Sequence, residues 1–182
     1  NSSGTLTVNN NNYTVAELVK INTGTSGSIV LNTDNVALSG TVSQFKSAFA
    51  GTITTHTGTV EITDANTTDI TATHITDING TNTGTITVTN TIDINGSGSE
   101  VKAAFDAIDT NTGNATAHIT GTDYTIAQLK SINNDTTGAI VLATPTATLS
   151  GEVADIVAAF AGTVTTNTGA VTISDANTTD IQ

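Results

Sequence analysis

Short stretches of the chain alternate between apolar residues and threonine, and this alternation returns at fairly regular intervals. In the first stretch Leu6 and Val8 flank Thr7, so an extended backbone places both apolar side chains on one face. The same period of two recurs at Val60/Ile62, Ile86/Val88 and Val171/Ile173. Two other stretches, Ile29–Leu31 and Ile140–Leu142, are continuously apolar, as in a strand covered on both faces. The pattern predicts a series of short β-strands.

A second pattern follows most of these strands, with apolar residues three or four positions apart, as on the buried face of a helix. The stripes are Val15/Leu18/Val19, Val42/Phe45/Phe49, Val101/Phe105/Ile108, Ile126/Leu129/Ile132 and Val153/Ile156/Val157/Phe160. Three helices are expected to begin with a capping box, in which two side chains three residues apart accept from each other's backbone N–H. The boxes are Thr14/Glu17, Thr41/Gln44 and Thr125/Gln128. The aromatic residues lie on these stripes or at helix entries, which predicts that they belong to the core.

Glycine punctuates the chain, because a Thr-Gly or Ser-Gly pair precedes each new strand. Cutting the sequence after these pairs places boundaries after Gly27, Gly58, Gly84, Gly113, Gly138 and Gly169. We call each strand–turn–helix segment a coil. The predicted coils are approximately residues 3–27, 28–58, 59–84, 85–113, 114–138, 139–169 and the incomplete 170–182. An additional short strand is expected before the helix at Ala37/Leu38, Ile92/Ile94 and Ala147/Leu149.

The coils also repeat at a longer distance. Residues 48–70 match residues 159–181 without a gap, with 18 of 23 positions identical, and Tyr13 falls on Tyr124 at the same offset. The two copies are related by an offset of 111 residues along the chain, and we call the residues related by this offset the first and the second repeat. Nested repetition of this kind is typical of a stacked array in which neighbouring coils form a common core. We therefore predict an α/β solenoid with coils of about 25–31 residues, a parallel β ladder and helices on one side. In that ladder, strands starting near Leu6, Ile29, Val60, Ile86, Ala117, Ile140 and Val171 pair in turn.

Composition narrows the class of protein. Sixteen acidic and four basic residues give a formal net charge of −12, which disfavours binding to nucleic acid or to anionic membrane surfaces. No apolar run approaches the roughly 18 residues of a membrane span, so no membrane insertion is expected. The chain has no cysteine, which excludes a disulfide framework or a thiolate metal site. Because the chain starts without methionine and stops inside an expected helix, we interpret it as a segment of a longer, extracellular or cell-surface protein.

The stretch Thr125 to Gly162, which contains TIAQLKSIN, TTGAIVLA and ATLSGEVADIVAAFAG, carries a resemblance to known proteins. It is similar to the repeat regions of very large secreted or cell-surface bacterial proteins of the marine or cyanobacterial type, described as adhesin-like or surface-layer-like. The resemblance extends over nearly the whole chain and implies a cell-surface or matrix role, often with calcium bound in neighbouring regions. The glycine–aspartate nonapeptide that binds calcium in many such proteins is absent here.

Candidate metal ligands recur in both long repeats. Oxygen ligands clustered in a turn could hold Ca²⁺, and the residues concerned are Asp64, Asn66 and Asp69 with their copies Asp175, Asn177 and Asp180. The alternative is that Asp64 and Asp175 close turns while Thr67 or Thr68 and their copies cap helices, with no cofactor bound. This alternative is favoured by the residue types.

The search for catalytic residues finds little. His56, His74 and His118 lie in different coils and are interpreted as surface polar residues, so no catalytic dyad or zinc site is expected and the chain is predicted not to be an enzyme. The predicted function is a structural segment of an extracellular rod, filament, stalk or surface coat, which associates end to end or with neighbouring repeats of the same polypeptide. The alternatives are a calcium-dependent adhesive module and, with less support, a threonine-rich ice-binding solenoid.

Overall fold

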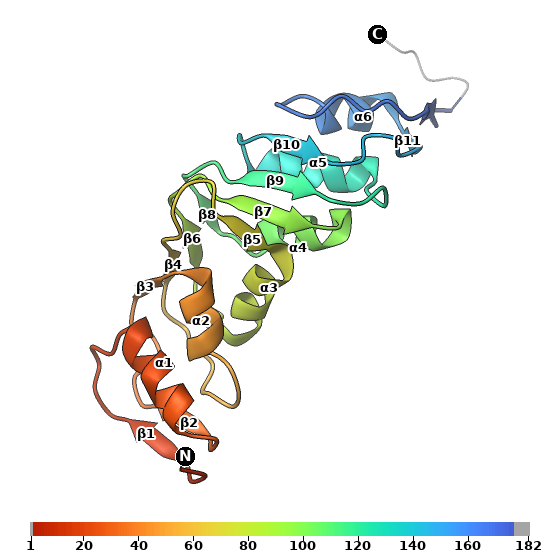
Figure 1. The fold of residues 1–182 in the computed structure, drawn as a ribbon. Coiled ribbons are helices and arrows are strands. Elements are labelled where there is room, and N and C mark those ends of the chain that lie inside the picture. Colours follow the sequence, from red (N-terminus) through yellow and green to blue (C-terminus); the bar gives the residue numbers. More distant parts are fainter. Residues whose placement is uncertain (1, 177–182) are drawn as a thin grey trace. The chain divides into compact units, whose positions relative to one another are not determined.

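The computed structural model describes residues 2–176, and this part of the chain is an α/β protein with parallel sheets and six helices (Figure 1). It divides into two compact units. The first unit contains the residues up to Asn66, His74–Asn90 and Ala107–Gly113, and the second contains Thr67–Thr73, Thr91–Asp106 and the residues from Asn114 onward. The chain therefore passes between the units more than once.

The strands of the first unit form two parallel sheets. β1 (Leu6–Val8) pairs with β2 (Ile29–Leu31), and Ile53 continues this pairing through a single bridge to Ile29. The second sheet has four strands in the order β3-β4-β6-β8. Their bounds are Leu38–Gly40 for β3, Val60–Ile62 for β4, Ile86–Val88 for β6 and Thr110–Asn111 for β8.

The second unit has a similar arrangement. Its larger sheet has the order β10-β9-β7-β5, and Val164 bridges to Ile140 in β10. Its smaller sheet pairs β11 with β12. The bounds are Asp69–Thr71 for β5, Asp93–Gly96 for β7, Thr116–Ile119 for β9, Ile140–Leu142 for β10, Leu149–Gly151 for β11 and Val171–Ile173 for β12.

Strand partners lie at a nearly constant distance in the sequence. Leu38 pairs with Val60 and Val60 pairs with Ile86, and these two pairs are the extremes of the spacing. All partners in the described residues are parallel and about 24 residues apart, a period typical of stacked repeats. After each stretch of about this length, the chain thus lies beside an earlier part of itself. The additional strands predicted near Leu38, Ile94 and Leu149 are present as β3, β7 and β11.

The single ladder expected from the sequence is wrong. Val60 does not follow Ile29 in the ladder, because its partner is Leu38 of the additional strand and Ile29 pairs instead with Ile53. In the second repeat Val171 pairs with Leu149 in the same way. Each additional strand offers backbone N–H and C=O groups for pairing. The following strand pairs with these groups and does not continue the first ladder.

The helices begin where the capping residues predict. The boxes Thr14/Glu17, Thr41/Gln44 and Thr125/Gln128 are all formed, at the starts of α1 (Val15–Gly24), α2 (Val42–Ala48) and α5 (Ile126–Asp135). The remaining helices are α3 (Ala72–Thr81), α4 (Gly98–Asp106) and α6 (Val153–Ala159). The expectation that Thr67 or Thr68 caps a helix is wrong, because β5 intervenes before α3 and Thr67 has a positive φ of 61°.

The apolar stripes and the inward-facing strand residues form the core. Phe45 and Phe105 are the largest of the fully buried side chains, and Tyr13 and Tyr124 are only 2% exposed, so these aromatic residues are core residues as predicted. Phe160 is half-buried. Each fully buried aliphatic or aromatic side chain contributes about 1.5–3 kcal/mol through removal of its apolar surface from water.

The punctuating glycines lie where successive coils approach closely. A Cβ atom on Gly84 would lie 2.1 Å from the carbonyl oxygen of Gly58, which excludes any larger residue without movement of the backbone. The glycines at the other cuts are crowded in the same way by backbone that lies about one strand-pairing interval earlier in the chain. They are Gly27, Gly58, Gly113, Gly138 and Gly169. The glycines that mark the predicted coil boundaries are therefore required by close backbone packing.

Candidate functional site

Asp64, the first of the predicted metal ligands, is buried and caps a helix of the preceding coil. Its Oδ2 atom accepts a hydrogen bond of 2.7 Å from the backbone N–H of Val42, the first residue of α2. The amide of Asn90 donates to the backbone carbonyl of Asp64 at 2.7 Å. Because the first N–H groups of a helix have no partner within the helix, a carboxylate at this position satisfies one of them and interacts favourably with the helix dipole.

Asp175 makes the corresponding contact in the second repeat. Its Oδ2 atom accepts a hydrogen bond of 2.8 Å from the N–H of Val153, the first residue of α6. Glu152 occupies the position of Thr41 and makes no side-chain cap, so the distant carboxylate has a larger share in satisfying this helix start. Each of the two aspartates therefore caps a helix of the preceding coil.

Two of the other predicted ligands lie on the surface. Asn66 and Asp69 are exposed, and Asp69 accepts a hydrogen bond of 3.1 Å from the amide of Asn95 in the neighbouring strand. Asn177 and Asp180 lie outside the described residues. Within residues 2–176 no group of three or more His, Cys, Asp or Glu side chains is arranged to hold a metal ion. The calcium hypothesis for these residues stays a prediction.

Asparagine side chains join the C-terminal ends of neighbouring helices, a role that the sequence analysis missed. The amide of Asn22 in α1 donates to the carbonyl oxygens of Ser47 and Ala50, at 2.7 and 2.8 Å. Asn133, the equivalent of Asn22 in the second repeat, donates to the carbonyl of Ala158 at 3.1 Å. These amides satisfy carbonyl groups left free at the C-terminal ends of α2 and α6. Their recurrence at the same place in both repeats is the signal that could have identified them.

His56 is fully buried, so its interpretation as a surface residue is wrong. Its Nδ1 lies 2.7 Å from Oδ1 of Asn82, and its Nε2 lies 2.8 Å from the carbonyl oxygen of Val36. Nδ1 thus contacts the following coil, whereas Nε2 contacts the backbone of the coil that contains His56. In the second repeat Asn167 takes this position, and its amide nitrogen donates to the carbonyls of Ala147 and Gly169, each at 3.2 Å. A structural link between coils explains why two different polar residues occupy one position.

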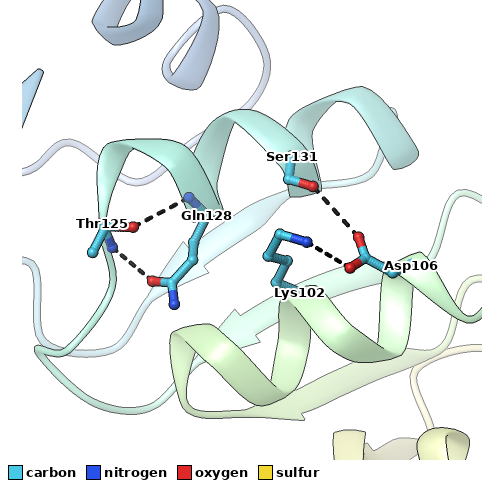
Figure 2. Close-up of polar contacts among 5 residues, drawn as sticks. All are labelled: Lys102, Asp106, Thr125, Gln128 and Ser131. Carbon is cyan, nitrogen blue, oxygen red and sulfur yellow. Dashed lines mark hydrogen bonds and ion pairs between the residues drawn. The ribbon is translucent and has the colours of Figure 1, made fainter.

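The helices of the second unit carry paired charges. In Figure 2, Lys102 forms an ion pair with Asp106 on α4, and Ser131 of α5 donates a hydrogen bond of 3.4 Å to the same carboxylate. The figure also shows the capping box of Thr125 and Gln128 at the start of α5. Burial, and then the negative charge of Asp106, raise the pKa of Asp135 above its usual value. The exposed ion pair of Lys102 and Asp106 contributes little to stability, about 0–1 kcal/mol.

A cavity of about 470 Å³ lies between α2 and α3 in the first unit. Its walls include Phe45, Phe49 and Ile78 together with the charged Lys46 and Asp77. The two phenylalanine rings are 5.7 Å apart and tilted by 46°, so they give the cavity an aromatic wall. Its volume is in the range of small-molecule pockets. The sequence predicted both phenylalanines as core residues but gave no indication of a cavity beside them.

None of the helices in the described part of the chain has the length and apolar content that a membrane-crossing helix requires. A scan against protein-family models and searches of curated proteins and of solved structures found no match to this chain.

Proposed function

We propose that this chain is a solenoid of stacked strand–turn–helix coils with a structural, non-enzymatic function. The observation that carries the proposal is the nearly constant separation of strand partners, which are parallel throughout the described residues and about 24 residues apart, within the range of repeat proteins. When each strand pairs with one that lies about 24 residues earlier, every such interval adds one layer to the stack. A coil this short cannot bury its apolar face alone, and it depends on its neighbours for a core.

Polar residues that make the same contact in both repeats support the same proposal, because they join one coil to the next. Asp64 and Asn22 bind the two ends of α2 from different coils, and Asp175 and Asn133 repeat both contacts on α6. His56 is used in a similar manner. The polar groups of these side chains are thus engaged within the chain itself, which supports a structural role for them.

The biological role that we propose is a segment of an extracellular rod, filament, stalk or surface coat. The charge of −12 supports it, since such a surface stays hydrated and resists non-specific association with nucleic acid and with anionic membranes. The internal copy of residues 48–70 at residues 159–181 also supports it, because an array can be lengthened by repetition without change to its interior.

The stacking proposal can be tested by lengthening the chain. A second copy of residues 48–158, inserted before Ala159, adds one full long repeat and hence roughly four to five coils at the observed separation of partners. Because parallel strands are spaced by about 4.8 Å, the insertion should lengthen the particle by about 20 Å. Small-angle scattering would measure the longest dimension and the cross-section. A glycine–serine insertion of equal length is the control, and a compact particle of increased cross-section would contradict the solenoid.

The role at the cell surface requires a separate test. Antibodies raised against the chain should label intact cells of the organism that produces it, and protease added to intact cells should remove the label. A cytosolic protein of the same organism serves as the control for cell integrity. Labelling that appears only after the cells are broken open would contradict a surface function, whatever the fold.

A further inference from the structure

The cavity of about 470 Å³ between α2 and α3 combines an apolar floor with charged walls (Figure 1). Phe45 and Ile78 are at most 1% exposed and form its floor, and Phe49 extends the apolar surface toward the solvent. Lys46 of α2 and Asp77 of α3 also line it, and both are exposed. The cavity therefore offers a cation, an anion and an apolar surface to one molecule.

The two charges beside this cavity are not neutralised by the chain. In the part of the chain that the structure describes, neither Lys46 nor Asp77 takes part in an ion pair. A second cavity, of about 350 Å³, lies beside α4, α5 and α6. Its two lysines, Lys102 and Lys130, are each paired with an aspartate of the chain. The charges of the first cavity are thus available to a ligand, whereas the lysines of the second are already engaged.

The side chain of His74 in α3 feels both charges, so they act on the same small region. Burial, and then the positive charge of Lys46, lower the pKa of His74 below its ordinary value of 6.5. The negative charge of Asp77 opposes this decrease. The imidazole is therefore mainly neutral at pH 7 and adds no third charge. One cation from α2 and one anion from α3 remain.

This pair of charges restricts the class of ligand. A simple anion would be attracted by Lys46 but repelled by Asp77 and by the net charge of −12. A simple cation would be attracted by Asp77 but repelled by Lys46. A zwitterion with an apolar group matches the cation, the anion and the floor together. An α-amino acid carries both of its charges next to one carbon atom, which leaves its side chain free to lie against the floor.

We propose that the cavity between α2 and α3 binds a free α-amino acid with an aromatic or branched apolar side chain. The carboxylate of the ligand pairs with Lys46, and its ammonium group pairs with Asp77. Its side chain lies over Phe45, Phe49 and Ile78, where an aromatic ring can take the tilted or offset arrangement that such rings prefer. This binding activity goes beyond the proposed structural function, and all of its residues belong to the first unit.

Three probes test the role of each charge. L-phenylalanine has both charges, N-acetyl-L-phenylalanine lacks the ammonium group, and L-phenylalaninamide lacks the carboxylate. In titrations of the ¹⁵N-labelled chain followed by NMR, L-phenylalanine should bind most tightly. Lys46→Val, which introduces the residue found at the equivalent Val157, should weaken L-phenylalanine by up to about fivefold and leave the amide unaffected or improved. Asp77→Asn should weaken L-phenylalanine to a similar extent but should not weaken the N-acetyl compound.

A matched pair of glycine variants tests the location. Gly80 of α3 lines the cavity, and Gly24 ends α1 away from it, and both have open space where a Cβ would stand. Leucine favours a helix over glycine, so both leucine variants should fold. Gly80→Leu should abolish binding of L-phenylalanine, and Gly24→Leu should preserve it. Absence of saturable shifts at millimolar L-phenylalanine, equal affinity for the three probes, or full binding by Gly80→Leu would overturn the proposal. None of these outcomes affects the stacking or cell-surface tests.

Discussion

Residues 48–70 and 159–181 are identical at 18 of 23 positions, but equivalent strand residues within them differ in how well they are buried. Val60 and Ile62 are inaccessible to solvent, whereas Val171 and Ile173 are about half exposed, although each pair alternates with polar residues in the same way. The alternation sets which side chains share a face of the strand. In the first repeat that face is buried where β6 pairs with β4 on the side away from β3, so burial depends on more than the alternation.

The same comparison at the helix starts shows how a distant residue can replace a local one. α2 has the capping box of Thr41 and Gln44 as well as the carboxylate of Asp64. α6 has Glu152 in place of Thr41 and no local side-chain cap, but it retains Asp175. The contact between coils is thus common to both repeats, whereas the contact within the helix is found in only one of them.

The largest expected effect concerns the two isoleucines. Ile62→Ala should lower the free energy of unfolding by about 2–5 kcal/mol, because it removes buried methylene groups and leaves a cavity. Ile173→Ala should change it by no more than about 0.5 kcal/mol in the monomer. Denaturant unfolding of both variants at a concentration where the chain is monomeric measures the difference. Equal losses would show that β12 is buried in solution and would remove the basis of the comparison.

The aspartates should give a smaller contrast of the same sign. Asp64→Ala leaves the buried N–H of Val42 without its acceptor and should cost about 1–3 kcal/mol. Asp175→Ala removes a cap at a half-buried position and should cost about 0.5–2 kcal/mol. Asp64→Asn is the matched control, because its amide oxygen can still accept and should preserve most of the stability. A loss as large for Asp64→Asn as for Asp64→Ala would indicate that the charge, and not the hydrogen bond, is important.

These contacts also show where analysis of the sequence succeeds and where it stops. The alternation at Leu6/Val8, the helical stripes and the capping box at Thr14 are local patterns, and each predicts its element because strand and helix periods are properties of neighbouring residues. The pairing of Val60 with Leu38 and the capping of Val42 by Asp64 are not local. The pairing depends on which of two strands offers free backbone groups to Val60. The cap depends on which residues lie beside the start of α2. Neither is set by residues that are close in the sequence.

Candidate sites were harder to predict than the fold for a related reason. Asp64 was identified as a special residue because it recurs as Asp175 in the second repeat, but recurrence does not distinguish a metal ligand from a helix cap. His56 lacks even this signal, since Asn167 replaces it, and only its burial between Val36 and Asn82 reveals its role. Glycine gave the most informative signal, because Gly84 and the glycines at the other cuts lie where a Cβ atom would collide with backbone from earlier in the chain.

The two equivalent tyrosines should differ in alkaline solution. Burial, and then the nearby charge of Asp34, raise the pKa of Tyr13 to about 12. Burial also raises the pKa of Tyr124, but a backbone hydrogen bond with Ala147 opposes the increase, and Pro145 stands where the first repeat has Asp34. The protonated phenol of Tyr13 therefore contributes stability that is fully present below its ordinary pKa of 10.0 and is lost as the pH rises through about 12.

Absorbance of the ionised phenol separates the two groups. Tyr124→Phe leaves Tyr13 as the only tyrosine, and its titration in the folded chain should be centred near pH 12. Adding Asp34→Asn should move this titration to lower pH, because it removes a negative charge that disfavours ionisation. Tyr13→Phe isolates Tyr124, whose titration should not respond to Asp34→Asn. Identical responses of the two tyrosines to that substitution would contradict the assigned cause.

The smallest expected effect is that of calcium. If Asp64, Asn66 and Asp69, or their copies, bound the ion, the folded state would be stabilised by preferential binding, and the melting temperature would rise in calcium relative to chelator. We expect the two melting temperatures to agree, because Oδ2 of Asp64 is engaged by Val42 and a carboxylate oxygen of Asp69 is engaged by Asn95. Magnesium at equal concentration controls for ionic strength. A rise that is specific to calcium and is abolished by Asp69→Ala would assign the metal site to the first repeat, whereas abolition only by Asp180→Ala would assign it to the second.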